Sequence, residues 1–320
     1  MARKFDVAVM HDFFVDRLVH AGRLSAITDA ISEKEEAGGG GVHGFPQDEV
    51  AGGNAVNLAR GLARLGLRTL LITHSDPSHE GLLRNSFKGL QAEVRVKPLA
   101  AGLTVAFEGE ANVMLNDVRG AGEFGPSILD ESDWDALEGS KVVCSVNWAS
   151  NRKGTELLVA LRSRLGGEKT IFFDPADFRD RAPEFQQLLL LLAAKHLVDW
   201  VSMNTQEGGA AARAFGIGSR DRGKMCRALA GRLGVVFDLH GLDASLTSEG
   251  TRLSEATIER ARPRRLTGAG DAWDAGAIFG RLRGMDEAPR LRFANRVARL
   301  YLQSPEHLPP TIEEVMGVSR

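Results

Sequence analysis

Short apolar runs alternate with longer segments whose apolar residues recur at helical spacing along most of the chain. The runs have strand length and are predicted to be buried strands: residues 5–10, 69–73, 141–144, 170–173, 200–203 and 234–239. The main segments with helical periodicity lie between them or follow them: residues 54–65, 78–90, 155–165, 271–282 and 291–301. Because strands that alternate with helices form parallel sheets, we predict an α/β fold. Its mostly parallel, doubly wound sheet would carry helices on both faces.

Two parts of the chain interrupt this alternation. Residues 92–99, 104–108 and 111–115 are predicted strands without helices between them. Residues 21–50 have little hydrophobic periodicity, and their glycine run at 38–41 is predicted to be a mobile hairpin tip, because no strand-to-helix context frames it. The Gly-Glu-Lys-Thr segment at 167–170 lacks the upstream glycine of a phosphate-binding loop and enters a strand, so we reject that interpretation.

Composition excludes several classes of protein. A chain of 320 residues is long enough for one large α/β domain with an insertion. The formal net charge of −2 offers no basic excess for a nucleic-acid partner. Two cysteines cannot form a disulfide framework, and no apolar run reaches membrane-spanning length. We therefore expect a cytoplasmic protein that binds neither nucleic acid nor membrane.

One glycine-rich segment is the strongest candidate for chemistry. Gly268 and Gly270, separated by Ala269, precede a predicted helix and let the backbone approach a ligand closely. Their N–H groups then point outward at a helix N-terminus, where the helix dipole favours negative charge, so they form a cradle for a phosphate or an oxyanion. Asp271 follows in the first turn. Its carboxylate either caps the helix or takes a proton from a hydroxyl group that attacks the cradled phosphorus.

A second glycine pair opens another predicted helix. Gly52 and Gly53 permit close approach to a ligand, Asn54 is a suitable N-cap, and Asn57 falls on the first turn facing back toward the loop. Asp16 follows the first predicted strand, at the end of an open α/β sheet where ligands bind.

A third candidate follows the strand at 200–203. Asn204 and Glu207 are three residues apart and share one face of a helical turn. Such a pair forms a capping box, or it binds the hydration shell of Mg²⁺, which takes few direct carboxylate ligands. The spacing alone leaves both interpretations open.

The two glycine segments, in this order, resemble the signatures of a known family. Thr-Gly-Ala-Gly-Asp-Ala at 267–272, followed by an aromatic and a small residue, resembles the C-terminal signature of the ribokinase-like (PfkB) carbohydrate kinases. Gly-Gly-x-x-x-Asn at 52–57 resembles the N-terminal signature of the same family. The resemblance covers nearly the whole chain. It implies a single ribokinase-like domain over residues 1–320, with a small β lid from insertions at about 17–50 and 100–118.

The resemblance also implies an activity, which is phosphoryl transfer from ATP or ADP to a hydroxyl group of a sugar or nucleoside. Asp271 would be the catalytic base, with Gly268, Ala269 and Gly270 as the anion hole. Acceptor contacts would come from Asp16, Gly52, Gly53 and Asn57. Nucleotide contacts would come from Asn204, Glu207, Thr267 and Asn295, with Glu207 holding Mg²⁺ through water. A homodimer that forms through the lid is also compatible with the resemblance.

The chain departs from the family pattern at several positions. Arg265-Leu266 stands where the family usually has Asp-Thr, so we expect K⁺ activation to be weak or absent. His240 and Asp243 replace a common Gly-x-x-Gly turn beside the nucleotide. Two alternatives stay open. The acceptor could be a sugar phosphate, whose second anion Arg17, Arg264 and Arg265 would bind, or the chain could be a catalytically weakened sugar- or nucleotide-binding protein.

Overall fold

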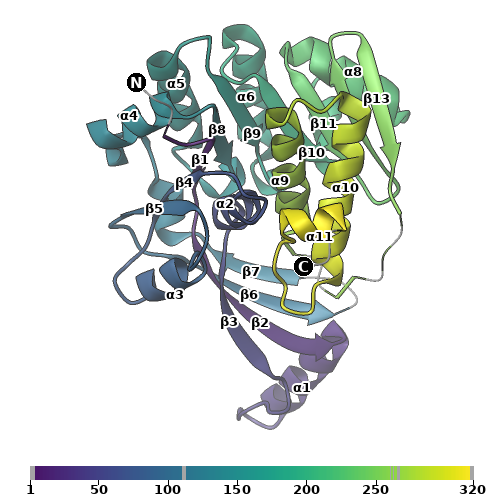
Figure 1. Ribbon diagram of the computed structural model, residues 1–320. Coiled ribbons are helices and arrows are strands. Elements are labelled where there is room, and N and C mark those ends of the chain that lie inside the picture. Colours follow the sequence, from purple (N-terminus) through teal and green to yellow (C-terminus); the bar gives the residue numbers. More distant parts are fainter. Residues whose placement is uncertain (1–3, 110–112, 260, 262, 265–266, 318–320) are drawn as a thin grey trace.

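The structure is a computed structural model that describes residues 4–109, 113–259, 261, 263–264 and 267–317 (Figure 1). Within these residues the larger sheet has nine strands, in the order β13-β12-β11-β10-β9-β8-β1-β4-β5. Their bounds along the chain are β1 Val7–His11, β4 Thr69–His74, β5 Ala92–Lys97, β8 Val142–Val146, β9 Thr170–Asp174, β10 Trp200–Asn204, β11 Val236–His240, β12 Ala244–Glu249 and β13 Arg252–Thr257. All neighbouring strands from β5 to β11 are parallel, whereas β12 and β13 are antiparallel additions at one edge.

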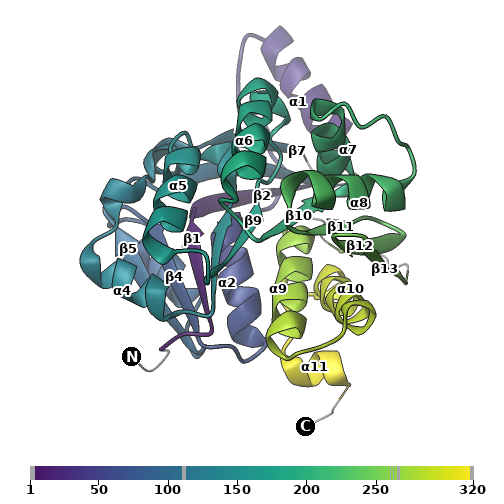
Figure 2. The same ribbon diagram turned by 90° about the horizontal axis from the view of Figure 1, so that it is seen from above.

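Helices cover both faces of this sheet (Figure 2). One face carries α2 (Asn54–Arg64), α9 (Ala269–Leu282), α10 (Glu287–Gln303) and α11 (Ile312–Met316), with the short α3 (Glu80–Asn85) toward the β5 edge. The other face carries α4 (Glu131–Gly139), α5 (Gly154–Leu165), α6 (Ala182–Lys195), α7 (Thr205–Ala214) and α8 (Arg222–Leu233). The predicted α/β fold with a mostly parallel sheet between two helical layers is therefore confirmed.

The continuous apolar runs are explained by burial on both sides. Val7 and Val9 of β1 join the core under α2 and α9, whereas Ala8 and Met10 join the core on the opposite face. Side chains alternate between the two faces of a strand, so a strand covered on both faces must be apolar at every position.

A second sheet of four described strands, in the order β3-β2-β6-β7, projects from the lower end of the larger one (Figure 1). Its strands are β2 Phe14–Gly22, β3 Gln47–Gly52, β6 Gly102–Gly109 and β7 Val113–Asp117. We call this sheet the lid. Its strands overlap the two predicted insertions, with β2 beginning directly after β1.

The sequence did not predict the helix α1 (Leu24–Glu36), which lies at the far tip of the lid (Figure 1). Leu24, Ile27 and Ile31 are spaced by three and four residues, and of these only Ile27 is buried. So narrow an apolar stripe gives little hydrophobic periodicity, which is why the segment resembled a loop. Helix α6 was not predicted for the opposite reason, because the run Leu188–Leu192 is apolar at every position.

A fully buried ion pair joins α10 to β11. Arg290 donates through Nη1 and Nη2 to the two carboxylate oxygens of Asp238, at 2.7 and 2.8 Å, and neither side chain is exposed. Trp200 donates its Nε1–H to the same carboxylate at 2.9 Å, and its ring lies 5.1 Å from the Arg290 guanidinium. Each member of this network has a partner, as a buried charge requires.

Candidate active site

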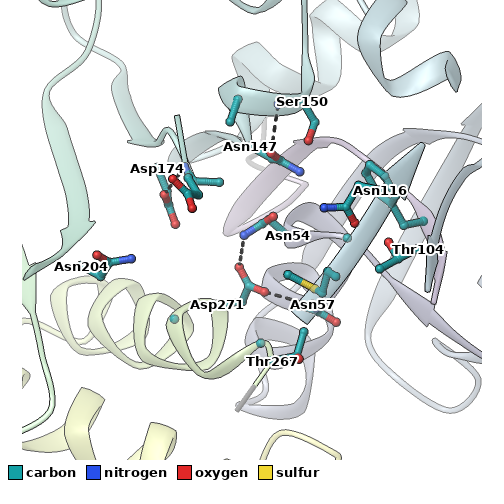
Figure 3. A pocket seen from close by; sticks show the side chains of 18 of the residues that line it. Asn54, Asn57, Thr104, Asn116, Asn147, Ser150, Asp174, Asn204, Thr267 and Asp271 are labelled. Carbon is teal, nitrogen blue, oxygen red and sulfur yellow. Dashed lines mark hydrogen bonds between the residues drawn. The ribbon is translucent and has the colours of Figure 1, made fainter. Parts of the chain in front are cut away.

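A cavity of about 370 Å³ lies between the lid and the C-terminal ends of the parallel strands (Figure 3). Asn147, Asp174, Asn204 and His240 line it, and each stands at or directly after the end of β8, β9, β10 or β11. Further lining residues come from lid strands: Phe14, Asp16, Thr104, Met114 and Asn116. The carboxyl ends of parallel strands are where open α/β sheets bind ligands.

Most of the predicted site residues line this cavity: Asp16, Gly53, Asn57, Asn204, Glu207, Thr267, Gly268, Gly270 and Asp271. Gly52, Ala269 and Asn295 are not among the lining residues.

The side chain of Asp271 points toward Asn54 and Asn57 of α2 (Figure 3). Its Oδ1 accepts a hydrogen bond from Asn54 Nδ2 at 2.9 Å, and its Oδ2 accepts one from Asn57 Nδ2 at 3.0 Å. Both carboxylate oxygens are therefore held by amides of a different helix, rather than by backbone N–H groups of α9. Asp271 therefore does not cap α9, and its role as the catalytic base stays a prediction.

The surroundings of Asp271 make it a stronger base than an exposed aspartate. Burial raises the pKa of Asp271 well above its usual value, and the negative charge of Asp174 raises it further. The hydrogen bonds from Asn57 and Asn54 partly oppose this shift. A raised pKa moves the carboxylate toward the range in which a general base works best near neutral pH.

The cradle beside Asp271 depends on glycine. Gly268 is the N-cap of α9 in the left-handed region, with φ 84°, and a Cβ there would lie 2.6 Å from Tyr301 Oη. The first N–H groups of a helix have no partner within the helix. The first N–H groups of α9 lack a partner within the helix for this reason, and their role as an anion cradle stays a prediction.

The second glycine pair makes room for two aspartates, Asp16 and Asp12. A Cβ on Gly52 would lie 1.9 Å from Oδ2 of Asp16, so only glycine fits beside this buried side chain. Gly53 has φ 99°, and a Cβ on it would lie 2.9 Å from the carbonyl oxygen of Asp12. Gly52 thus shapes the site by admitting Asp16, although it does not line the cavity itself.

Asp12 caps α2, a role that sequence reasoning missed. The sequence predicted Asn54 as the N-cap of α2. The helix instead begins at Asn54, and its N-cap is Gly53. The fully buried carboxylate of Asp12 accepts hydrogen bonds from the backbone N–H groups of Asn54 and Ala55 at 2.8 and 2.9 Å, and from Asn147 Nδ2 at 2.8 Å. Because Asp12 does the capping, the side chain of Asn54 is free to hold Asp271.

Asn204 and Glu207 form the capping box that their spacing allowed, and their role at Mg²⁺ stays a prediction. Asn204 Oδ1 accepts from the backbone N–H of Glu207 at 2.9 Å, and Glu207 Oε2 accepts from the backbone N–H of Asn204 at 2.9 Å, which is a capping box at the start of α7. Both side chains also line the cavity. Burial, followed by the charge of Asp174, raises the pKa of Glu207 to about 8.

Asp174 is a further member of the site whose role the sequence did not reveal. It ends β9, is buried, and lies near Asp271, Asp274 and Glu207, since its charge raises the pKa of each. Asp274, on α9, also accepts a hydrogen bond from Ser202 Oγ at 2.6 Å. No Lys or Arg is among the described residues that line the cavity. This excess of carboxylates fits a bound cation.

The carboxylates of the cavity suit Mg²⁺, which keeps most of its water ligands, better than a metal ion whose ligands all come from the protein. Among the described residues, no group of three or more His, Cys, Asp or Glu side chains is placed to hold a metal ion directly. Mg²⁺ keeps several waters and takes one or two carboxylates, and Glu207 and Asp174 can provide these.

The match to a family of known proteins covers most of the chain. The sequence model of the prokaryotic ketohexokinase family matches residues 19–319. The chain belongs to this family. It is therefore a kinase of the sugar and nucleoside kinase group to which ketohexokinases and ribokinases belong.

Solved structures show that this ketohexokinase-family chain has the ribokinase fold. A probable sugar kinase from Rhizobium etli has a TM-score of 0.80 at 19% identity over 100% of both chains. Ribokinase from Arabidopsis thaliana, solved with ribose and ATP, has a TM-score of 0.76 at 19% identity over 99% of both chains. A putative ribokinase II from E. coli, in complex with ATP and Mg²⁺, has a TM-score of 0.79 at 14% identity over 99% of both chains. No curated protein matches the chain in sequence.

Asn295 and Thr267, which were predicted to contact the nucleotide, both form hydrogen bonds within this ketohexokinase-family chain. Asn295 accepts a hydrogen bond from Trp273 Nε1 at 2.8 Å and donates to the carbonyl oxygens of Ala256 and Thr257 at 3.4 and 3.3 Å. Thr267 lines the cavity, and its carbonyl oxygen accepts from Tyr301 Oη at 2.6 Å. Their nucleotide contacts stay predictions. Arg265 and Leu266, on which the K⁺ expectation rests, lie outside the described residues.

The structure bears on the expectation about membranes but not on the expectation of a homodimer. None of the described helices combines the length and the apolar character that crossing a bilayer requires. The homodimer through the lid stays a prediction.

Proposed function

We propose that the protein transfers the γ-phosphoryl group of ATP to a hydroxyl group of a sugar, and that ketohexoses are its acceptors. The observation that carries this proposal is the position of Asp271, buried in the cavity beside the glycine cradle and held by Asn54 and Asn57. The match to the prokaryotic ketohexokinase family over residues 19–319 supports a ketohexose as the acceptor.

In the proposed reaction, the acceptor hydroxyl oxygen attacks the γ-phosphorus while its proton passes to Asp271. The new bond to phosphorus forms as the bond from phosphorus to the oxygen of the departing ADP breaks. Asn54 and Asn57 fix the direction of the Asp271 carboxylate, and the N–H groups at Gly268–Gly270 stabilise the charge on the phosphoryl oxygens.

The charges around the cavity favour a neutral sugar over a sugar phosphate. Among the described lining residues, carboxylates and amides are frequent and no Lys or Arg occurs. Arg17 pairs with Glu49 on the exposed side of the lid, and Arg264 is exposed and does not line the cavity. A second phosphate on the acceptor would therefore lack a cation among the described residues, and recognition of phosphate usually depends on one.

Glu207, Asn204 and Asp174 would hold Mg²⁺ through its water ligands. When bound, Mg²⁺ neutralises charge on the donor phosphates. We expect Glu207→Gln to raise the Mg²⁺ concentration that half-maximal activity requires, because glutamine cannot lose a proton to become a carboxylate when Mg²⁺ binds. Glutamine still completes a capping box, so the fold should persist. The measurement is kcat against Mg²⁺ concentration, with acceptor binding followed by calorimetry. An unchanged Mg²⁺ dependence would reduce Glu207 to a helix cap.

Asp16 would bind neighbouring hydroxyl groups of the acceptor. Asp16→Asn should weaken acceptor binding by about 1–3 kcal/mol, the usual cost of losing a hydrogen bond to a charged group. Asp48→Asn is the matched control, because Asp48 lies on the adjacent lid strand, pairs with His20 and does not line the cavity. Calorimetry of both variants with the acceptor decides the matter. Equal affinities in Asp16→Asn and wild type would place the acceptor elsewhere.

The decisive experiment is an acceptor panel. Ketohexoses, aldoses, nucleosides and sugar phosphates are each incubated with the protein, Mg²⁺ and either ATP or ADP, and phosphorylated products are identified by mass spectrometry. We expect ketohexose phosphate to form with ATP. Turnover of nucleosides or sugar phosphates alone would correct the acceptor class, and turnover with ADP alone would correct the donor. Binding of a sugar without any turnover would indicate a binding protein.

A further inference from the structure

His240 places an imidazole ring at the phosphate cradle. It is the last residue of β11 and lies opposite Asn204 of β10 in the sheet register. Its ring lines the cavity together with Gly268 and Gly270, and the Cε1 atom lies 3.5 Å from where a Cβ on Gly270 would be. Cε1, which lies between the two ring nitrogens, is therefore the part of the imidazole nearest to this Cβ position of Gly270.

Contacts with neighbouring residues fix the orientation of the His240 ring. His240 stacks on the indole of Trp273, with ring centroids 5.0 Å apart and an interplanar angle of 27°. Trp273 is in turn tied through its Nε1–H to Asn295. The backbone of His240 is also held, because its carbonyl oxygen accepts a hydrogen bond from Thr205 Oγ1 at 3.1 Å. A preorganised ring loses little side-chain entropy when it binds a ligand.

The chemical state of the ring suits a hydrogen bond to a phosphoryl oxygen. Burial lowers the pKa of His240 to about 4, although the nearby charge of Asp238 partly opposes the shift. The imidazole is therefore neutral near pH 7 and carries one N–H donor and one acceptor nitrogen. Among the described residues, none forms a hydrogen bond with either ring nitrogen, and no Lys or Arg lines the cavity. The N–H group of His240 is thus a donor without a partner at a site built for an anion.

We propose that His240 binds the donor nucleotide by donating its ring N–H to a phosphoryl oxygen in the cradle. This proposal rests on the proposed kinase function and adds a phosphate contact to it. Hydrogen bonds to charged phosphate are stronger than those between neutral groups. Losing one should weaken binding of the phosphate-bearing ligand by roughly ten- to a hundredfold, and should leave a ligand without phosphate unaffected.

The experiment compares wild type, His240→Phe and His240→Gln by calorimetry with two probes. AMP-PNP with Mg²⁺ carries the phosphates, and adenosine lacks them. Phenylalanine keeps the stack on Trp273 and removes the N–H, whereas glutamine restores an N–H donor without the ring. We expect His240→Phe to lose roughly ten- to a hundredfold in affinity for AMP-PNP while adenosine binds as in wild type, and His240→Gln to recover part of the loss. The KM for the sugar should not change.

The opposite results overturn the proposal. If His240→Phe binds AMP-PNP as wild type does, or if both probes lose affinity equally, the ring only walls the cavity. Melting temperatures show whether each variant is folded, and the glutamine variant provides the comparison if the phenylalanine variant does not fold. Failure of the proposed function has a different signature, because wild type would then phosphorylate no acceptor in the panel, whatever the affinities of the His240 variants.

Discussion

Asp271→Asn is expected to lower kcat by roughly 10²–10⁴-fold, the range that a general base contributes. The variant keeps the size of the side chain and loses the oxygen that would take the proton from the acceptor hydroxyl. The structure supports this expectation, because both carboxylate oxygens are held by the amides of Asn54 and Asn57 and the side chain caps no helix. The measurement is kcat at saturating sugar and ATP, together with the melting temperature and the affinity for ATP.

Asp274→Asn is the matched control for this experiment. Asp274 lies one helical turn further along α9, is equally buried and does not line the cavity. The carboxylate of Asp274 accepts a hydrogen bond from Ser202 Oγ, and the amide oxygen of asparagine can accept the same bond. We expect its kcat to stay within a few-fold of wild type. If Asp271→Asn melts normally and also turns over within a few-fold of wild type, Asp271 is not the base.

The largest loss of stability is expected from Arg290→Met. This change leaves the Asp238 carboxylate buried without its cation, and breaking a buried ion pair in this way costs about 3–5 kcal/mol. The double variant Asp238→Asn with Arg290→Met removes both charges, keeps an acceptor for Trp200 Nε1, and should recover much of the loss. Free energies of unfolding from urea titrations give the comparison.

A surface pair provides the control for Arg290→Met. Arg222 pairs with Asp243, whose side chain is 66% exposed, and exposed pairs contribute about 0–1 kcal/mol. Arg222→Met should therefore unfold almost as wild type does. A loss of less than about 1 kcal/mol in Arg290→Met would show that the buried network contributes no more than a surface pair.

Local patterns were sufficient to predict the fold and the two glycine segments. The apolar runs identified six strands of the larger sheet, because each is buried along almost all of its length and carries its signal within a few residues: β1, β4, β8, β9, β10 and β11. Gly268 and Gly53 were recognisable from sequence as positions of close backbone approach, and in the structure both adopt a positive φ. Asp271 was found for the same reason, since it stands directly beside the cradle in sequence.

Residues whose role depends on distant partners could not be assigned in this way. Asp12 caps a helix that begins 42 residues later, so no local pattern shows the capping. The acidic neighbours of Asp174 come from other elements, Glu207 from α7 and Asp271 from α9. Gly52 matters only because the lid brings Asp16 against it. Helix α1 was not predicted because only Ile27 among its apolar residues is buried. These features follow from tertiary packing, which a single sequence does not display.

The charge of the cavity has a consequence for the end of the catalytic cycle. In the proposed reaction, phosphoryl transfer converts a neutral sugar into an anion beside Asp16 and Asp174. No Lys or Arg among the described lining residues compensates the new charge, so electrostatic repulsion favours departure of the product. The same arrangement that admits an uncharged acceptor thus opposes rebinding of the phosphorylated one, and we expect turnover to proceed with little inhibition by accumulated sugar phosphate.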